Sequence, residues 1–248
     1  MNQEMVLGMV LSAMPVGEYD KRLVILTKEH GKIAAFARGA RRPQSPLMGC
    51  SQPFAFGNFT VYRGRDSYTV SAGEISNYFY ELRDDLEGAY YGFYFCEFAD
   101  YLTRENIDAT GILKLLYQTL RCLTKKTICY RLVRVVFELK IVAINGEAPQ
   151  MFECTKCGKK EEGMVFSGRE GGLLCKECER NRKIWDKRIL SPAAVYAMQY
   201  IIGTPVEKLY TFTVTPEVLR ELEDCMKEYL EIYVNHSFKS LEILEIFG

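Results

Sequence analysis

The chain has 248 residues, of which 48% are hydrophobic and 26% are charged, and its basic and acidic residues balance to a net charge of zero. This is the composition of an ordinary soluble globular protein, and the length allows one large domain or two to three smaller ones. No stretch approaches the roughly 18 consecutive apolar residues of a membrane span, so we expect no membrane segment.

The apolar run from Met5 to Val16 resembles the core of a signal peptide, but it follows Glu4 instead of a basic residue. No cleavage pattern of small residues follows it. The run therefore predicts a buried first strand, and we expect the protein to be cytoplasmic.

The zero net charge hides an uneven distribution. Between Lys21 and Arg65, Glu29 is the one acidic residue among nine basic ones, so this stretch carries +8 and the remainder carries −8. The nine are Lys21, Arg22, Lys28, Lys32, Arg38, Arg41, Arg42, Arg63 and Arg65. An asymmetry of this size predicts an anionic partner for one part of the molecule.

The same region has the pattern of β-structure. The predicted strands are Val6–Leu11, Arg22–Thr27, Lys32–Ala37, Asn58–Arg63 and Ser67–Ala72. Turn signals such as His30-Gly31 and Pro43 separate these runs, and no segment has a helical period. Five short strands in this arrangement predict a small barrel, for which the OB-fold is the leading candidate.

After Ser76 the apolar residues recur at three- and four-residue spacing, which predicts helices. The predicted helices are Glu87–Thr103, Ile112–Leu123, Ile128–Ala143, Ser191–Ile202 and Pro216–Asn235. Ser191 and Thr215 each precede a proline and are the expected N-caps of the last two helices. The aromatic residues of the first helix are more typical of a core than of a binding surface.

Four cysteines form two C-x-x-C pairs, Cys154 with Cys157 and Cys175 with Cys178, separated by seventeen residues. Each pair brings two sulfur atoms within reach of one ion, and the Gly-rich sequence between the pairs predicts a hairpin that folds one pair onto the other. Four thiolates leave no open ligand position, so the spacing predicts a structural Zn²⁺ site. An iron–sulfur cluster or redox chemistry at one pair are the alternatives, but the βαβ setting of thioredoxin-like proteins is absent.

The other five cysteines are scattered, and their odd number argues against a secreted disulfide framework. They are Cys50, Cys96, Cys122, Cys129 and Cys225. We expect most of them to be small buried hydrophobic residues.

The sequence favours a protein that is not an enzyme. It has none of the common nucleophile, phosphate-binding or dinucleotide-binding motifs. Its two histidines, His30 and His236, stand apart from any nucleophile motif and are typical of turn or cap positions.

Arg38, Arg41 and Arg42 place three guanidinium groups within five residues at the end of a predicted strand. Arginine donates hydrogen bonds in a fork that matches phosphate oxygens, so this cluster favours binding to a nucleic-acid backbone. The aromatic residues Tyr19, Phe36, Tyr62 and Tyr68 lie nearby in the sequence and are candidates for stacking on bases. The alternative is that these aromatics form the barrel core and the arginines are ordinary surface residues.

The chain resembles the RecO family of bacterial recombination mediators and DNA repair proteins. The matching segments are Gly17-Glu18-Tyr19-Asp20-Lys21, Leu23–Thr27, Gly31-Lys32-Ile33, Ala37-Arg38-Gly39-Ala40-Arg41-Arg42, Asn145-Gly146-Glu147-Ala148-Pro149, Cys154-Thr155-Lys156-Cys157-Gly158 and Ser191–Ile202. They occur in the order of the family and span nearly the whole chain.

The resemblance implies an α+β protein with an OB-fold at residues 1–78, followed at 79–248 by a helical domain that carries a zinc finger at 151–182. It implies binding of single- and double-stranded DNA, annealing of complementary strands, and help in loading RecA on DNA coated by single-strand-binding protein (SSB). RecR and the acidic C-terminal tail of SSB are the implied protein partners, and the bacterial nucleoid is the implied location. We expect the SSB tail to bind in a groove of the helical domain.

Residue by residue, the resemblance places the main DNA contacts at Lys32, Arg38, Arg41 and Arg42, and further contacts at Lys21, Arg22, Arg63 and Arg65. The alternative function is that of a zinc-ribbon adaptor whose basic barrel binds an acidic protein. A nucleic-acid-modifying enzyme would need catalytic residues that the sequence does not show.

Overall fold

The computed structural model describes residues 3–181 and 184–247. These residues form two compact units: one ends at Thr127 and includes the C-terminal segment from Phe238, and the other is Ile128–Ser237. The domain boundary predicted between residues 78 and 79 stays a prediction, and the end of the predicted zinc finger at residue 182 lies outside the described residues. Among the described residues, no helix is both long and apolar enough to cross a membrane.

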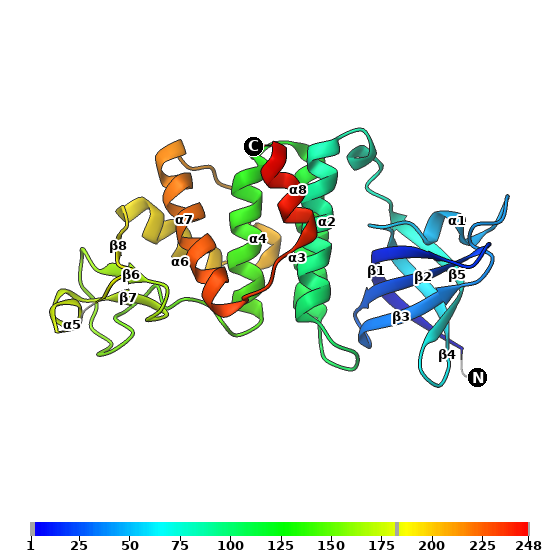
Figure 1. Ribbon diagram of the computed structural model, residues 1–248, viewed down its shortest axis with the longest axis horizontal. Coiled ribbons are helices and arrows are strands. Elements are labelled where there is room, and N and C mark those ends of the chain that lie inside the picture. Colours follow the sequence, from blue (N-terminus) through cyan, green and yellow to red (C-terminus); the bar gives the residue numbers. More distant parts are fainter. Residues whose placement is uncertain (1–2, 182–183, 248) are drawn as a thin grey trace. The chain divides into compact units, whose positions relative to one another are not determined.

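The first unit begins with a closed five-stranded barrel (Figure 1). Its strands are β1 (Gln3–Val16), β2 (Asp20–Thr27), β3 (Gly31–Ala37), β4 (Phe56–Arg63) and β5 (Tyr68–Asn77). They follow one another around the barrel in the order β1-β2-β3-β5-β4, with β3 and β5 parallel and the other pairs antiparallel. The predicted OB-like barrel is confirmed, although most strands are longer than their sequence patterns.

Alternating side chains explain how these strands enclose a core. In β3, Ile33, Ala35 and Ala37 are buried, and the residues between them are partly exposed. The first half of β1 pairs with β4 and its second half pairs with β2, with a bulge between Val10 and Ser12. Because β1 has a partner on both sides, the sheet closes and leaves no free edge.

The strand register shows which loops lie at each end of the barrel. β3 ends at Ala37, which pairs with Lys21 at the start of β2. The β4–β5 hairpin follows Arg63, and β5 then runs parallel to β3, with Tyr68 opposite Ala35. Parallel strands point the same way, so this hairpin lies toward the start of β3, whereas the loop after Ala37 lies at its end.

The rest of the first unit is helical. Its elements are α1 (Leu47–Cys50), η1 (Tyr80–Arg83), α2 (Leu86–Leu102), α3 (Thr110–Lys125) and α8 (Lys239–Phe247). Tyr94 and Phe98 of α2 are buried, which confirms that its aromatic stripe is largely core. Asp85 caps α2 by accepting a hydrogen bond from the backbone N–H of Gly88 (2.9 Å), and it pairs with Lys126.

The C-terminal helix α8 was not expected from the sequence. It packs beside α2 (Figure 1). The carboxylate of Glu97 on α2 accepts hydrogen bonds from the backbone N–H groups of Lys239 (3.2 Å) and Ser240 (3.0 Å). It therefore satisfies N–H groups that have no partner within the helix and interacts favourably with the helix dipole.

The second unit holds the cysteine segment between two helices. Its elements are α4 (Tyr130–Ile144), β6 (Val165–Ser167), β7 (Gly172–Leu174), α5 (Lys176–Arg180), β8 (Arg188–Ile189), α6 (Pro192–Gly203), η2 (Val206–Lys208) and α7 (Pro216–Tyr233). Ser191 and Thr215 cap α6 and α7, as predicted. The predicted hairpin is confirmed as β6 and β7, and β8 adds a third strand beside β6.

Candidate metal centre and nucleic-acid surface

The four paired cysteines converge on one point in the second unit. The sulfur atoms of Cys154, Cys157, Cys175 and Cys178 all lie within 4.8 Å of one another. The sulfur atoms of Cys157 and Cys175 are 3.6 Å apart, close to the roughly 3.8 Å edge of a tetrahedron built from zinc–sulfur bonds of about 2.3 Å. This donor set fits a tetrahedral metal ion.

The local backbone conformation directs the four thiols toward one another. Gly158 has a positive φ of 71°, and its N–H donates to the carbonyl of Cys154 (2.9 Å), which closes a tight turn after the first pair. The second pair begins α5, where the N–H of Cys178 donates to the sulfur of Cys175 (3.5 Å). N–H groups aimed at sulfur stabilise the thiolate form, which is the form that binds metal.

The pKa of Cys154 reflects the same geometry. Burial raises the pKa of this thiol, but hydrogen bonds from backbone N–H groups, those of Cys175 and Lys156 foremost, outweigh that effect and lower it to about 6. These hydrogen bonds favour the thiolate form of Cys154. Cys154 is therefore well suited to bind a cation as a thiolate.

One acidic residue supports the metal centre without binding to it. The carboxylate of Glu161 accepts a hydrogen bond from the N–H of Lys176 (2.7 Å) and pairs with Lys159 (2.9 Å). It thereby joins the segment that follows the first cysteine pair to Lys176, which lies between the two cysteines of the second pair. The sequence does not indicate this contact, because the β6–β7 hairpin is what brings Glu161 and Lys176 together.

The arginine loop, residues 38–42, exposes the guanidinium groups of Arg38, Arg41 and Arg42 at the end of β3. Between them, Ala40 is 1% exposed and packs into the barrel core. The N–H of Arg42 donates to the carbonyl of Gly39 (3.0 Å), which closes the turn. The loop thus presents three cations from one turn that is anchored in the barrel.

Lys21 and Arg22 lie at the same end of the barrel, at the start of β2. Arg22 is exposed, whereas Lys21 is half-buried and donates to the carbonyl of Ser51 (3.0 Å). Burial and the nearby charge of Arg41 lower the pKa of Lys21. Its ammonium group is therefore already engaged within the barrel.

The other three predicted contacts lie elsewhere. Arg63 and Arg65 are exposed in the β4–β5 hairpin, at the opposite end of the strands from the arginine loop. Lys32 pairs with Asp100 of α2, with 2.7 Å between its Nζ and the carboxylate. The structure therefore does not gather the eight residues into one patch, and their contact with DNA stays a prediction.

The four aromatic residues of the barrel differ in exposure. Tyr19 is 40% exposed, and the guanidinium carbon of Arg42 lies 5.1 Å from the centroid of its ring. Phe36 and Tyr62 are partly exposed. Tyr68 is only 2% exposed, so the expectation that it stacks on bases is wrong.

The scattered cysteines differ in burial, and His30 contacts a carboxylate. Cys50, Cys96, Cys122 and Cys225 are buried as expected, whereas Cys129 is exposed. Beyond its turn position, His30 makes a contact that the sequence did not indicate, because its Nε2 lies 2.9 Å from the Glu4 carboxylate.

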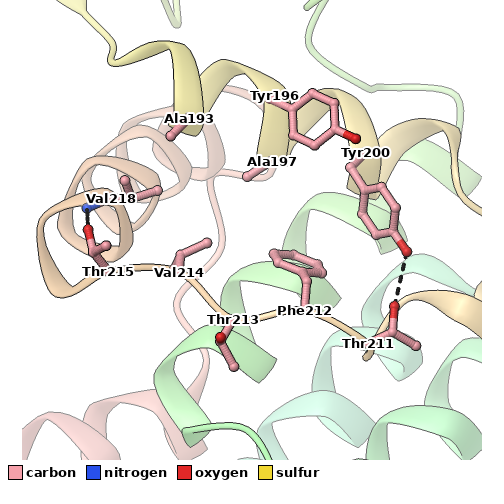
Figure 2. Close-up of a pocket in the computed structure, with 10 residues that line it drawn as sticks. All are labelled: Ala193, Tyr196, Ala197, Tyr200, Thr211, Phe212, Thr213, Val214, Thr215 and Val218. Atoms are coloured by element: carbon pink, nitrogen blue, oxygen red, sulfur yellow. Dashed lines mark hydrogen bonds between the residues drawn. The ribbon is translucent and has the colours of Figure 1, made fainter.

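A pocket of about 640 Å³ lies between α6 and the segment that leads into α7 (Figure 2). It is lined by Ala193, Tyr196, Ala197, Tyr200, Thr211, Phe212, Thr213, Val214, Thr215 and Val218. The hydroxyl oxygens of Tyr200 and Thr211 are 3.0 Å apart and tie the two walls together (Figure 2). None of these ten residues is charged, so the pocket suits an apolar side chain.

Comparison with known proteins accounts for both halves of the chain. Residues 1–79 match the family model for the N-terminal part of recombination protein O, and residues 83–242 match the model for its C-terminal part. The chain belongs to the RecO family. The barrel with the arginine loop lies within the first match, and the four cysteines lie within the second.

Several relatives carry the name DNA repair protein RecO. The protein of Alkaliphilus metalliredigens is 33% identical over 238 residues, covering 95% of this chain and 96% of the relative. Those of Acetivibrio thermocellus and Bacillus pumilus are each 31% identical over 96% of this chain, covering 94% and 91% of the relatives. The chain is thus a RecO-family protein of DNA repair and recombination, which supports the expectation that it is not an enzyme.

Proposed function

We propose that this RecO-family protein binds single- and double-stranded DNA, anneals complementary strands, and with RecR assists RecA loading on SSB-coated DNA in the bacterial cytoplasm, at the nucleoid. The observation that carries the proposal is the arginine loop, which exposes Arg38, Arg41 and Arg42 on an OB-like barrel of a RecO-family chain. Arg22, Arg63 and Arg65 are exposed cations that would extend the contact with phosphates, while Lys21 and Lys32 are partly used within the fold.

The proposed mechanism is electrostatic. Guanidinium groups that neutralise phosphates release counterions, so affinity for single strands falls with salt at a slope of roughly −0.7 per contact. Phosphate contacts carry no sequence information and leave the base edges free to pair with a second strand. Annealing by this route needs no nucleotide hydrolysis and no catalytic residue.

We further propose that the ion held by Cys154, Cys157, Cys175 and Cys178 is Zn²⁺ in a structural role. Four sulfur donors within 4.8 Å of one another suit zinc, and the set leaves no position for a reacting water molecule. Metal analysis of the purified protein tests the proposal, and a chain free of zinc that still folds its hairpin contradicts it.

The pocket beside α6 is our candidate groove for the apolar part of the SSB tail. Ala193 is exposed at the pocket and offers a matched pair of variants. Ala193→Glu places an anion at the pocket and should weaken binding of an acidic tail peptide, whereas Ala193→Lys should not. Equal affinity of both variants for the peptide contradicts this location. RecR is also proposed as a partner, because the chain belongs to the RecO family; no part of the chain is assigned as its contact surface.

The test of DNA binding is titration of random single strands at several salt concentrations. We expect salt-dependent binding that Arg38→Ala/Arg41→Ala/Arg42→Ala largely loses. The matched control is Arg38→Lys/Arg41→Lys/Arg42→Lys, which keeps the charge and should keep most of the salt dependence. No binding by the wild type contradicts the proposal and favours the alternative, a zinc-ribbon adaptor whose basic barrel binds an acidic protein.

A further inference from the structure

An acidic residue lies directly against the arginine loop. Asp20 begins β2, and its Oδ1 accepts a hydrogen bond from the N–H of Gly39 at 2.7 Å. Coulomb's law alone predicts that a carboxylate at this place weakens binding to a polyanion. The residue therefore needs an explanation other than its charge.

The hydrogen bond to Asp20 fixes the backbone of Gly39, the residue of the arginine loop with a left-handed conformation. Gly39 has a φ of +69°, a left-handed conformation that side chains other than glycine rarely adopt. A Cβ atom at Gly39 would lie 3.6 Å from the Cδ of Arg42, so the Arg42 side chain folds back over this glycine. The carboxylate of Asp20 thus fixes the turn from which Arg42 is directed.

Other contacts join the arginine loop to the turn between β1 and β2. The N–H of Arg41 donates to the carbonyl of Tyr19 (2.8 Å), and its Nη1 donates to the carbonyl of Gly17 (3.2 Å). The guanidinium of Arg42 lies over the ring of Tyr19. These contacts therefore hold the two loops together. Among them, the hydrogen bond to Asp20 is the one whose acceptor is a charged side chain.

We propose that Asp20 is a positioning residue: its carboxylate holds the arginine loop in the conformation that grips the DNA backbone. The inference rests on the proposed DNA-binding function and deepens it. A loop that is ordered before binding spares the entropy of ordering it on the DNA. This gain outweighs the local repulsion between the carboxylate and phosphate.

The experiment compares four single variants of the full-length, zinc-loaded protein by titration of a fluorescent oligothymidylate at several salt concentrations. Asp20→Ala removes both the charge and the acceptor, whereas Asp20→Asn removes the charge and keeps the acceptor. Glu18→Ala is the matched control. Glu18 is exposed in the same turn, and its side chain makes no ion pair within the part of the chain that the structure describes.

We expect Asp20→Ala to bind roughly three- to tenfold more weakly than the wild type, which is the size of the net contribution of one ordinary hydrogen bond. Its salt slope should also become shallower, because fewer phosphates are neutralised together. Asp20→Asn and Glu18→Ala should bind at least as tightly as the wild type. Gly39→Ala, which keeps every charge but strains the turn, should weaken binding like Asp20→Ala.

The outcomes separate the inference from the function on which it rests. If Asp20→Ala binds as tightly as Glu18→Ala, or if Asp20→Asn is as weak as Asp20→Ala, the positioning role is overturned. If Asp20→Ala does not fold, unchanged affinity of Gly39→Ala overturns it in the same way. If the wild type itself shows no salt-dependent binding, the proposed DNA-binding function has failed.

Discussion

Lys32 Nζ lies 2.7 Å from the Asp100 carboxylate and 2.6 Å from the main-chain carbonyl of the same residue. One ammonium group thus ties β3 of the barrel to α2. The Lys32 side chain is 24% exposed, so the pair is partly shielded from water. We expect the main role of Lys32 to be structural.

Lys32→Ala should therefore lower the free energy of unfolding by about 1 kcal/mol. Its effect on single-strand affinity should be no larger than that of Lys28→Ala, the matched control. Lys28 is exposed, and its side chain has no ion pair among residues 3–181 and 184–247. Urea denaturation and DNA titration measure the two effects. A Lys32→Ala variant of normal stability that loses DNA binding contradicts this role.

Removal of the metal should unfold the cysteine segment and spare the barrel. Structural zinc contributes about 10–16 kcal/mol of apparent binding free energy in zinc-finger peptides, so a short hairpin that loses it should unfold. We expect a chelator, or Cys157→Ser, to expose the segment around β6 and β7 to protease while the barrel stays protected. Limited proteolysis with mass spectrometry locates the cuts. Equal protection with and without chelator would argue against a structural metal.

The C-terminal segment should stabilise the first unit strongly. Phe238 is 4% exposed, and its ring centroid lies 4.7 Å from that of Phe98 and 5.5 Å from that of Tyr94. Phe238→Ala should lower the free energy of unfolding by about 3–5 kcal/mol because it leaves a cavity. Ile246→Ala, at a position 80% exposed on α8, is the control and should have little effect. Equal urea midpoints for the two variants would contradict this packing.

Buried thiols should make stability fall at alkaline pH. Burial raises the pKa of Cys225 to about 12, from an ordinary value of 9.0. Above pH 9 an unfolded chain releases this proton and the folded chain keeps it, so stability declines as pH rises toward the folded pKa. Cys225→Ala should reduce the drop in unfolding free energy between pH 8 and pH 10 by about 1 kcal/mol.

Cys129→Ala is the matched control for this measurement, because Cys129 is exposed and its removal should leave the drop unchanged. Chemical denaturation at the two pH values gives the comparison. A drop that is the same in the wild type and in Cys225→Ala would show that the thiol does not contribute to it.

Much of the fold could be predicted from local pattern. The β6–β7 hairpin lies between the two C-x-x-C pairs, as predicted, because these pairs and the glycines between them leave the chain few other conformations. The five barrel strands were found by alternation, while α8 was missed. It is only nine residues long, and its stability depends on Glu97 and on the aromatic residues of α2, which no local pattern reveals.

The candidate DNA surface was less predictable. Charge counting found the arginine loop, whose residues lie together in the chain. It also grouped Lys32 with that loop, although the partner of Lys32 is 68 residues away. The charge pattern likewise does not indicate the role of Asp20 as an acceptor, which depends on the pairing of β2 with β3 and on the turn at Gly39. Tertiary contacts decide which cations remain free.

The arginine loop should allow this RecO-family protein to anneal DNA. The most direct measurement is the annealing rate of complementary single strands coated with SSB, for the wild type and for Arg38→Ala/Arg41→Ala/Arg42→Ala. We predict that the wild type accelerates annealing and that the triple variant loses this acceleration with its fold and zinc content intact. A wild type that fails to accelerate annealing, alone or with RecR, would contradict the account.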